Sequence, residues 1–404
     1  MLALAFLLSA AAAAADTALP RAAPPGAQAA PAVTVHHQPA LPVVALRLSV
    51  LAPDPPGYAG AGHFIQHLHL PRLEEQAARV GARVQAIRGT DAVVYSVVGP
   101  ASELPYLAGL LQAALRPPAP SSAELLAAQR ALAEERAAGR ETAPAYVRAA
   151  LRARVFPADL PPAGTDAAAS RLEGTRLRDV WGTMYRPGRV SVVAVGDVEL
   201  EAVRRAFRDL PGAPAEGLGD EAADTVPALE ADTPQATRGW IGTAWSAPEA
   251  DPAAMSVAAR LLQGALRRRM PRSAVEVEHW WTHQGQALAL VVATPDSLVP
   301  AARRTVSGAL ETLRQGLGAR AVRDAANGVR RDLLFFSRTP ERMAELIGEF
   351  TDREGDPEAA QRFYAALEAV TEDDVRRLLD LLAAQEPATV YVPAQRIPEA
   401  NRRR

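Results

Sequence analysis

The side chains best suited to chemistry gather in the string His63-Phe64-Ile65-Gln66-His67. Residues i and i+4 of a helix share one face, so His63 and His67 could hold one metal ion. A hydrolytic zinc site also needs a third protein ligand, an open position for water, and a carboxylate that takes the proton from that water. The string His-x-x-Glu-His would supply two ligands and that base on a single helical turn. This chain has the two ligands.

Gln66 stands where the base would be. Glutamine has nearly the shape of glutamate and can still hydrogen-bond a zinc-bound water, but it accepts no proton at physiological pH. Loss of a general base lowers the rate by about 10²–10⁴-fold. We therefore expect that metal binding can survive here while turnover falls close to background.

The composition excludes several other chemistries. The chain of 404 residues contains no cysteine, which excludes disulfides, thiolate zinc sites and cysteine nucleophiles. It also contains no lysine, which excludes a Walker A phosphate loop and a Schiff-base mechanism. The formal net charge of −2 gives no reason to expect nucleic acid as a partner.

The N-terminus predicts export. Residues 1–15 resemble a signal peptide, with a short apolar core and an Ala-x-Ala site just before Asp16. This apolar run is too short to span a bilayer, and no later stretch is apolar for long enough. Residues 16–39 are rich in alanine and proline without periodicity, so we expect a leader or linker there. These features predict an exported, periplasmic protein without a membrane span.

The remainder predicts an α+β fold made of two repeated domains, each with a mainly antiparallel sheet packed against helices. The endings of the two halves match, because Thr175–Val180 and Thr371–Val375 each precede a helix and then a strand. The expected domains are 40–211 and 236–394, with a linker over 212–235 and a tail over 395–404. The expected strands are 41–50, 83–88, 92–98, 189–195, 239–246, 274–282, 286–294 and 389–392. The principal expected helices are 72–80, 121–139, 143–155, 250–269, 298–317, 319–336 and 340–351.

The histidine string, the repeat and the helical continuation resemble the insulinase or pitrilysin family of metallopeptidases. The resemblance is closest to short bacterial members related to the mitochondrial processing peptidase. It implies zinc as the cofactor, a peptide as the substrate, and a glutamate on a later helix as the third ligand. The run Arg130-Ala-Leu-Ala-Glu134-Glu135-Arg136 matches that helix. By this match Glu135 is the third ligand, with Glu134 as the alternative.

A second departure from the family lies in the other half of the chain. Catalytic chains or their partners carry an Arg–Tyr pair near a Leu-Arg-Glu-x-x-Gly-Leu-Ala-Tyr string, whereas Leu266–Glu276 contains no tyrosine. The resemblance therefore implies a non-catalytic subunit that helps to bind peptides, in a heterodimer with an intact His-x-x-Glu-His chain or in a homodimer. Two alternatives stay open: an active zinc endopeptidase that tolerates Gln66, and a structural exported scaffold.

The remaining histidines are interpreted without a metal. We expect His69 to be a polar surface residue. His279 and His283 are also four apart, but they fall in or just after a predicted strand, where four residues span about 13 Å. That separation is too large for one ion, so both are interpreted as structural.

Overall fold

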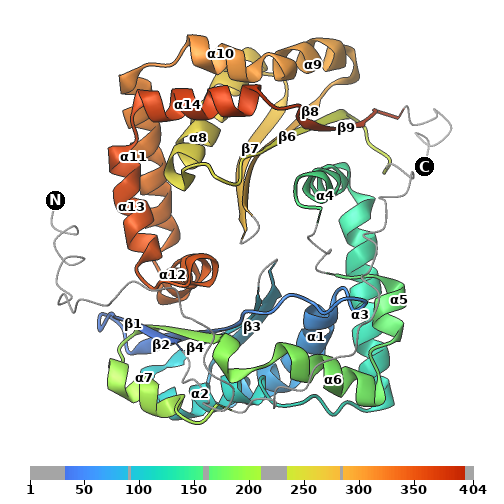
Figure 1. Cartoon of the computed structure of the whole chain (residues 1–404). Coiled ribbons are helices and arrows are strands. Elements are labelled where there is room, and N and C mark those ends of the chain that lie inside the picture. The colour runs from blue at the N-terminus through green and yellow to red at the C-terminus, as the bar shows by residue number, and fades with distance from the viewer. Residues whose placement is uncertain (1–31, 90–91, 158–162, 211–233, 283–284, 396–404) are drawn as a thin grey trace, which may run out of the picture.

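The computed structural model describes residues 32–89, 92–157, 163–210, 234–282 and 285–395. The chain folds into a first half (32–210) and a second half (234–395), each with one sheet and a set of helices (Figure 1). The predicted α+β fold with mainly antiparallel sheets is confirmed. The expected signal peptide, the expected linker up to residue 233 and the expected tail from residue 396 lie outside the described residues.

The first half carries a sheet with the strand order β1-β5-β2-β4-β3, in which only β1 and β5 run parallel. Its elements in chain order are β1 (Ala32–His37), β2 (Val43–Val50), α1 (Ala61–Ala78), β3 (Arg83–Arg88), β4 (Val93–Pro100), η2 (Ala101–Glu103), α2 (Leu104–Ala113), α3 (Ser122–Glu141), α4 (Ala143–Val155), α5 (Asp166–Ser170), α6 (Gly174–Met184), η3 (Pro187–Arg189), β5 (Val190–Gly196) and α7 (Leu200–Ala206).

The second half carries an antiparallel sheet with the order β7-β8-β6-β9. Its elements are β6 (Gly239–Ser246), α8 (Pro252–Arg269), β7 (Ala274–Thr282), β8 (Gly285–Thr294), η4 (Asp296–Leu298), α9 (Val299–Ser307), α10 (Ala309–Gln315), α11 (Ala319–Phe336), α12 (Pro340–Glu354), α13 (Ala359–Ala369), α14 (Glu372–Ala383) and β9 (Ala388–Val392). Of the helices in the described part of the chain, none has the length and apolarity to cross a membrane.

The expectation of a leader over 16–39 is wrong for its last residues. Ala32–His37 form β1, which pairs in parallel with β5 from Ala32 opposite Ser191 to His37 opposite Gly196. Val33 and Val35 alternate along the strand and pack on the core of the first half. Alanine and proline dominate the segment before them and hide this short β-branched pattern. The first half therefore begins within the expected leader.

Two helix boundaries also differ from expectation. The histidine string and most of the expected helix over 72–80 belong to one helix, α1, which continues through Pro71 and ends at Ala78. Proline lacks the N–H that would bond the carbonyl of His67, but burial of Leu73 and Ala77 against the core holds the helix together. The single helix expected over 298–317 is instead divided into η4, α9 and α10, with Gly308 as the break between the last two.

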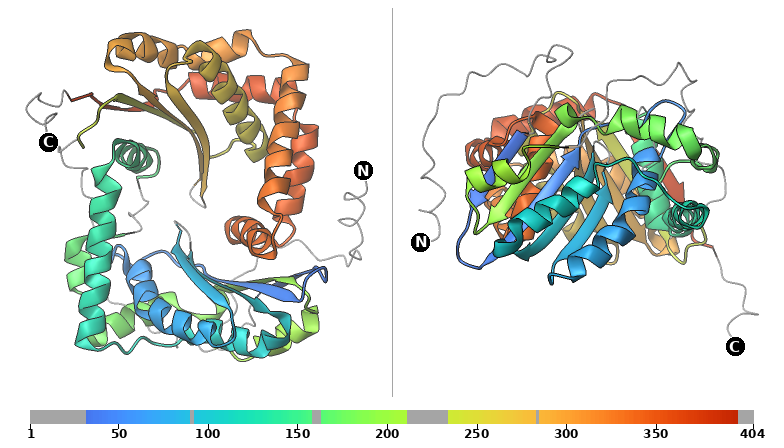
Figure 2. Two further views of the ribbon diagram at one scale, coloured as in Figure 1. Left: turned by 180° about the vertical axis from the view of Figure 1, so that it is seen from behind. Right: turned by 90° about the horizontal axis from the view of Figure 1, so that it is seen from below.

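Each half covers the inner face of the other half's sheet with one helix. Helix α4 packs on β6, β8 and β9 of the second half, and α12 packs on β2 and β5 of the first half (Figures 1 and 2). Gly242 on β6 permits one of these contacts, because a Cβ there would lie 2.4 Å from Val147 of α4. The outer face of the first sheet is covered by α1 and α2 from the same half.

A buried ion pair lies under α12. The alternation of β2 places Val44, Leu46 and Leu48 in the core and turns Arg47 to the inner face. There Arg47 lies 2.7 Å from Asp352 of α12, and both side chains are only 6% exposed. Ser49 and Ser191 also donate hydrogen bonds to the Asp352 carboxylate, at 2.9 and 3.0 Å. Both oxygens of the Asp352 carboxylate are therefore bonded to residues of the first half.

We predict that Asp352→Asn lowers the free energy of unfolding by about 3–5 kcal/mol, because it leaves the buried guanidinium of Arg47 without a counter-charge. The control is Glu341→Gln, which breaks a more exposed contact between the halves, the 2.6 Å ion pair with Arg83. That loss is expected to stay below about 1 kcal/mol. Urea unfolding of both variants measures the difference, and equal losses would contradict the role given to Asp352.

Candidate metal centre

The start of α1 is fixed by the first half's own backbone and charges. Asp54 accepts hydrogen bonds from the N–H groups of Gly60 and Gly62, at 2.7 and 2.9 Å. Its carboxylate also pairs with Arg88 of β3 at 3.3 Å, and both side chains are buried. Gly60 has φ +85° and lies so close to Gly164 that no side chain would fit. These contacts set where the next turn of α1 presents its side chains.

His63 and His67 converge on Glu135 of α3. The Nε2 atom of His63 lies 3.2 Å from one oxygen of the Glu135 carboxylate, and that of His67 lies 3.1 Å from the other. The two imidazole rings stack with their centres 4.7 Å apart. Both histidine side chains are mostly buried, while Glu135 is 47% exposed. The structure therefore brings together the two predicted ligands of α1 and the one implied for α3.

This donor set fits a zinc ion in chemistry and size. Ligands that each lie about 2.0–2.1 Å from one Zn²⁺ are separated by about 3.3 Å at a tetrahedral angle. The observed separations of 3.1 and 3.2 Å are close to this value, and one ligand atom from each residue lies within 4.8 Å of the others. Glu135, and not Glu134, forms the group with both histidines that could hold one ion among the described residues. The geometry favours Glu135 over Glu134, and ligation itself stays a prediction.

Gln66 lies beside this cluster, but its side-chain amide is hydrogen-bonded to a backbone carbonyl group. Its side chain is 4% exposed, and its Nε2 donates a hydrogen bond of 2.9 Å to the carbonyl oxygen of Ala86 on β3. A carboxylate has no proton to donate to that carbonyl at neutral pH. The amide therefore ties α1 to the edge strand, a role that the sequence did not reveal because Ala86 is twenty residues away.

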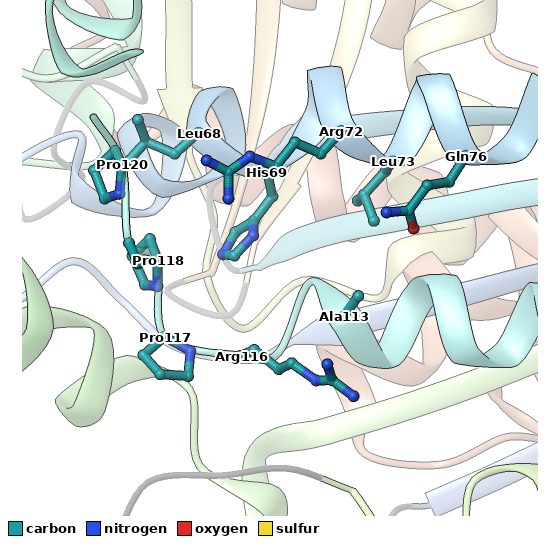
Figure 3. Close-up of a pocket in the computed structure, with 11 residues that line it drawn as sticks. Leu68, His69, Arg72, Leu73, Gln76, Ala113, Arg116, Pro117, Pro118 and Pro120 are labelled. Atoms are coloured by element: carbon teal, nitrogen blue, oxygen red, sulfur yellow. The ribbon is translucent and has the colours of Figure 1, made fainter. Parts of the chain in front are cut away.

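His69 differs from the expected surface residue. It lies two residues after His67, about 200° around the helix, and so faces away from the cluster. Its ring points into a hollow of about 250 Å³ between α1 and the proline-rich segment after α2 (Figure 3). Burial lowers the pKa of His69 to about 4, and Arg72 adds to this shift. His69 is half-buried because this side of α1 packs on Tyr95 and the proline segment.

His279 is hydrogen-bonded within the second half, which agrees with its structural interpretation. Its Nδ1 lies 2.9 Å from Ser256 Oγ, and its Nε2 lies 2.8 Å from Gln286 Oε1. His283 lies outside the described residues.

No family model matches the sequence, and no curated protein matches it either. Solved structures share the fold over nearly the whole chain. A protease from Helicobacter pylori has a TM-score of 0.75 at 14% identity, covering 88% of this chain and 96% of its own. An inactive peptidase M16 domain from Pseudomonas fluorescens has a TM-score of 0.74 at 14% identity, with coverages of 93% and 98%. A structure described as an M16-like peptidase, from Alicyclobacillus acidocaldarius, scores 0.71 at 15% identity, with coverages of 90% and 96%.

These likenesses establish that the chain has an M16 peptidase-like fold. The fold expected from the resemblance to the insulinase or pitrilysin family is confirmed.

We predict that Glu135→Gln weakens Zn²⁺ binding about 100-fold or more, because it removes the anionic ligand from the His63–His67 pair. Glu134→Gln removes the same charge from the neighbouring position and is expected to change the affinity less than twofold. Competition with a chromophoric chelator measures both. Equal weakening by the two changes would show that Glu135 acts only through net charge.

We predict that Gln66→Glu lowers the free energy of unfolding at pH 7 by about 1–3 kcal/mol, because it places a buried carboxylate against the carbonyl oxygen of Ala86. Gln76→Glu on the same helix is the control, since no side-chain hydrogen bond of Gln76 is seen in the described structure, and less than about 0.5 kcal/mol is expected. Thermal or urea unfolding without added metal compares them. An unchanged Gln66→Glu variant would contradict the anchoring role.

Proposed function

We propose that this chain is a non-catalytic member of the insulinase or M16 peptidase family that binds peptides beside a retained metal site. The observation that carries the proposal is that a glutamine, Gln66, lies next to three residues positioned to bind one metal ion. His63, His67 and Glu135 converge on one point. Beside them, the side-chain amide of Gln66 donates a hydrogen bond to the carbonyl oxygen of Ala86. The ligands are those of a hydrolase, and the group that should accept a proton is absent.

The chemistry that stays possible is binding and polarisation. His63, His67 and Glu135 would hold a zinc ion, which as a Lewis acid polarises a carbonyl group. Gln66 can orient a water molecule by hydrogen bonding but cannot take its proton. A peptide held at this site would therefore stay uncut or be cut at a rate close to background.

Peptide binding is supported by the position of β3. This strand is one edge of the first sheet, next to helix α1, which carries His63 and His67. The edge of a sheet presents unpaired N–H and C=O groups, to which an extended peptide can add as a further strand. A peptide there would lie alongside the metal ligands.

The proposed cellular setting rests on residues 1–15. Residues 1–15 resemble a signal peptide, so we place the protein in the periplasm. As a chain without its base, it fits the role of the substrate-binding partner in a two-chain peptidase whose other chain carries His-x-x-Glu-His. A homodimer is the alternative assembly. The fold likeness to an M16 domain described as inactive supports a non-catalytic role.

We predict that the purified chain binds about one zinc per molecule but does not cleave a quenched peptide library above a chelator-treated control. Metal analysis and fluorescence release measure the two quantities. The Gln66→Glu variant is assayed in parallel: a gain of about 10²-fold or more would show that only the base is missing. Metal bound without cleavage in either form would implicate the missing tyrosine of the second half.

The opposite result is equally clear. Chelator-sensitive cleavage by the wild-type chain that disappears in His63→Ala would make the chain an active zinc endopeptidase. Failure of the wild-type chain to bind any labelled peptide in an anisotropy titration would favour the structural scaffold.

A further inference from the structure

The second half repeats the arrangement that builds the metal centre. Helix α1 lies between β2 and the edge strand β3 in the chain. In the same way, helix α8 lies between β6 and the edge strand β7. Helix α3 packs beside α1, as α11 packs beside α8 (Figure 1). Ser256 and Arg260 are four apart on α8, like the two histidines of α1. Across from them, Arg260 pairs with Asp332 of α11, just as His67 contacts a carboxylate of α3.

This equivalent position is a hollow of about 610 Å³ between α8, β7 and α11. Its volume is in the range of pockets that bind small groups or peptide side chains. The polar residues that line it are Ser256, Arg260, Gln263, Arg267, His279 and Asp332.

Arg260 is held in place from two sides. Its guanidinium pairs with the carboxylate of Asp332 on α11. It also lies directly over Gly328, one turn earlier on α11, where an added Cβ would come within 2.1 Å of Arg260 Nε. Glycine is unfavourable in a helix interior, but here it leaves the space that the guanidinium fills. The side chain therefore lies in a fitted groove rather than being spread over the surface.

The charge of the hollow is positive. Arg267 lies two turns after Arg260 on α8 and donates from Nε to the carbonyl of Val275 at 3.2 Å. Among the described residues no carboxylate pairs with it. Burial lowers the pKa of His279 to about 4, so its ring, bonded to Ser256 and Gln286, is neutral at pH 7. Two guanidinium groups and one carboxylate, that of Asp332, therefore line the hollow.

We propose that this hollow binds a carboxylate of a peptide between Arg260 and Arg267. Arginine forks match carboxylate oxygens in two parallel hydrogen bonds. The carboxylate would come from the C-terminus of the peptide or from an aspartate or glutamate side chain. The proposal rests on the proposed peptide-binding function and adds to it the charge that the second half selects.

The test compares four labelled peptides of one length in an anisotropy titration of the full chain. One pair differs in a free or amidated C-terminus, and the other differs in an internal glutamate or glutamine. We expect the wild type to bind the carboxylate member of one pair about tenfold more tightly, which identifies the source. Arg260→Gln and Arg267→Gln are each expected to remove that preference. Gly328→Ala, which keeps both charges but displaces the guanidinium, should reduce it.

The matched control is Arg320→Gln, which removes the same charge from the exposed first turn of α11. It should keep the tenfold preference, and circular dichroism confirms that each variant is folded. Equal binding of all four peptides by the wild type would overturn the proposal, as would a preference that survives in Arg260→Gln.

A second measurement separates this proposal from the peptide-binding function. If no peptide binds the wild-type chain, the proposed function fails, and the hollow is tested with N-acetylglycine against uncharged N-acetylglycinamide. Arginine side-chain NMR should then show the Arg260 signal, identified by its loss in Arg260→Gln, shifting with the acid only. The absence of such a shift would overturn the proposal by itself.

Discussion

The exchange of one helix between the halves is the constraint on which the rest of the structure depends. Helix α12 brings Asp352 down onto β2, where Arg47 and two serines saturate its carboxylate in a nearly dry environment. A buried ion pair is stable only when both partners stay in place. A shift of α12 would therefore expose Arg47 or Asp352 to water or leave one of them buried without its partner. Helix α4 makes the reciprocal crossing, through close packing on Gly242.

Within that frame the candidate metal centre brings three possible ligands together, with the amide of Gln66 beside them. His63 and His67 reach Glu135 because α1 and α3 are packed side by side. Gln66, between them in sequence, points to the edge strand and donates a hydrogen bond to the carbonyl oxygen of Ala86. Gln66 thus joins the helix to the strand. Stability alone favours the amide here, because a buried glutamate would meet a carbonyl oxygen.

The sequence predicted what depends on short-range periodicity and missed what depends on distant partners. The i, i+4 spacing of His63 and His67 required only a helix, and the resemblance to a known family supplied Glu135 from far along the chain. The strand β1 was missed because Val33 and Val35 follow a long alanine- and proline-rich segment. The contact between Gln66 and Ala86, and the groove that Gly328 offers Arg260, depend on which helix faces which strand. No short-range sequence pattern predicts which helix faces which strand.

Because each half covers the other's sheet with a helix, the two halves cannot complete their folding one after the other. The sheet of the first half is complete once Gly196 of β5 has been made, yet the helix that covers its inner face ends at Glu354 of 404 residues. During synthesis, that face and the charge of Arg47 stay uncovered until the second half has been made. The first half therefore reaches its final state only together with the second. A chain cut between the halves would yield two incomplete fragments, each holding the helix that the other lacks.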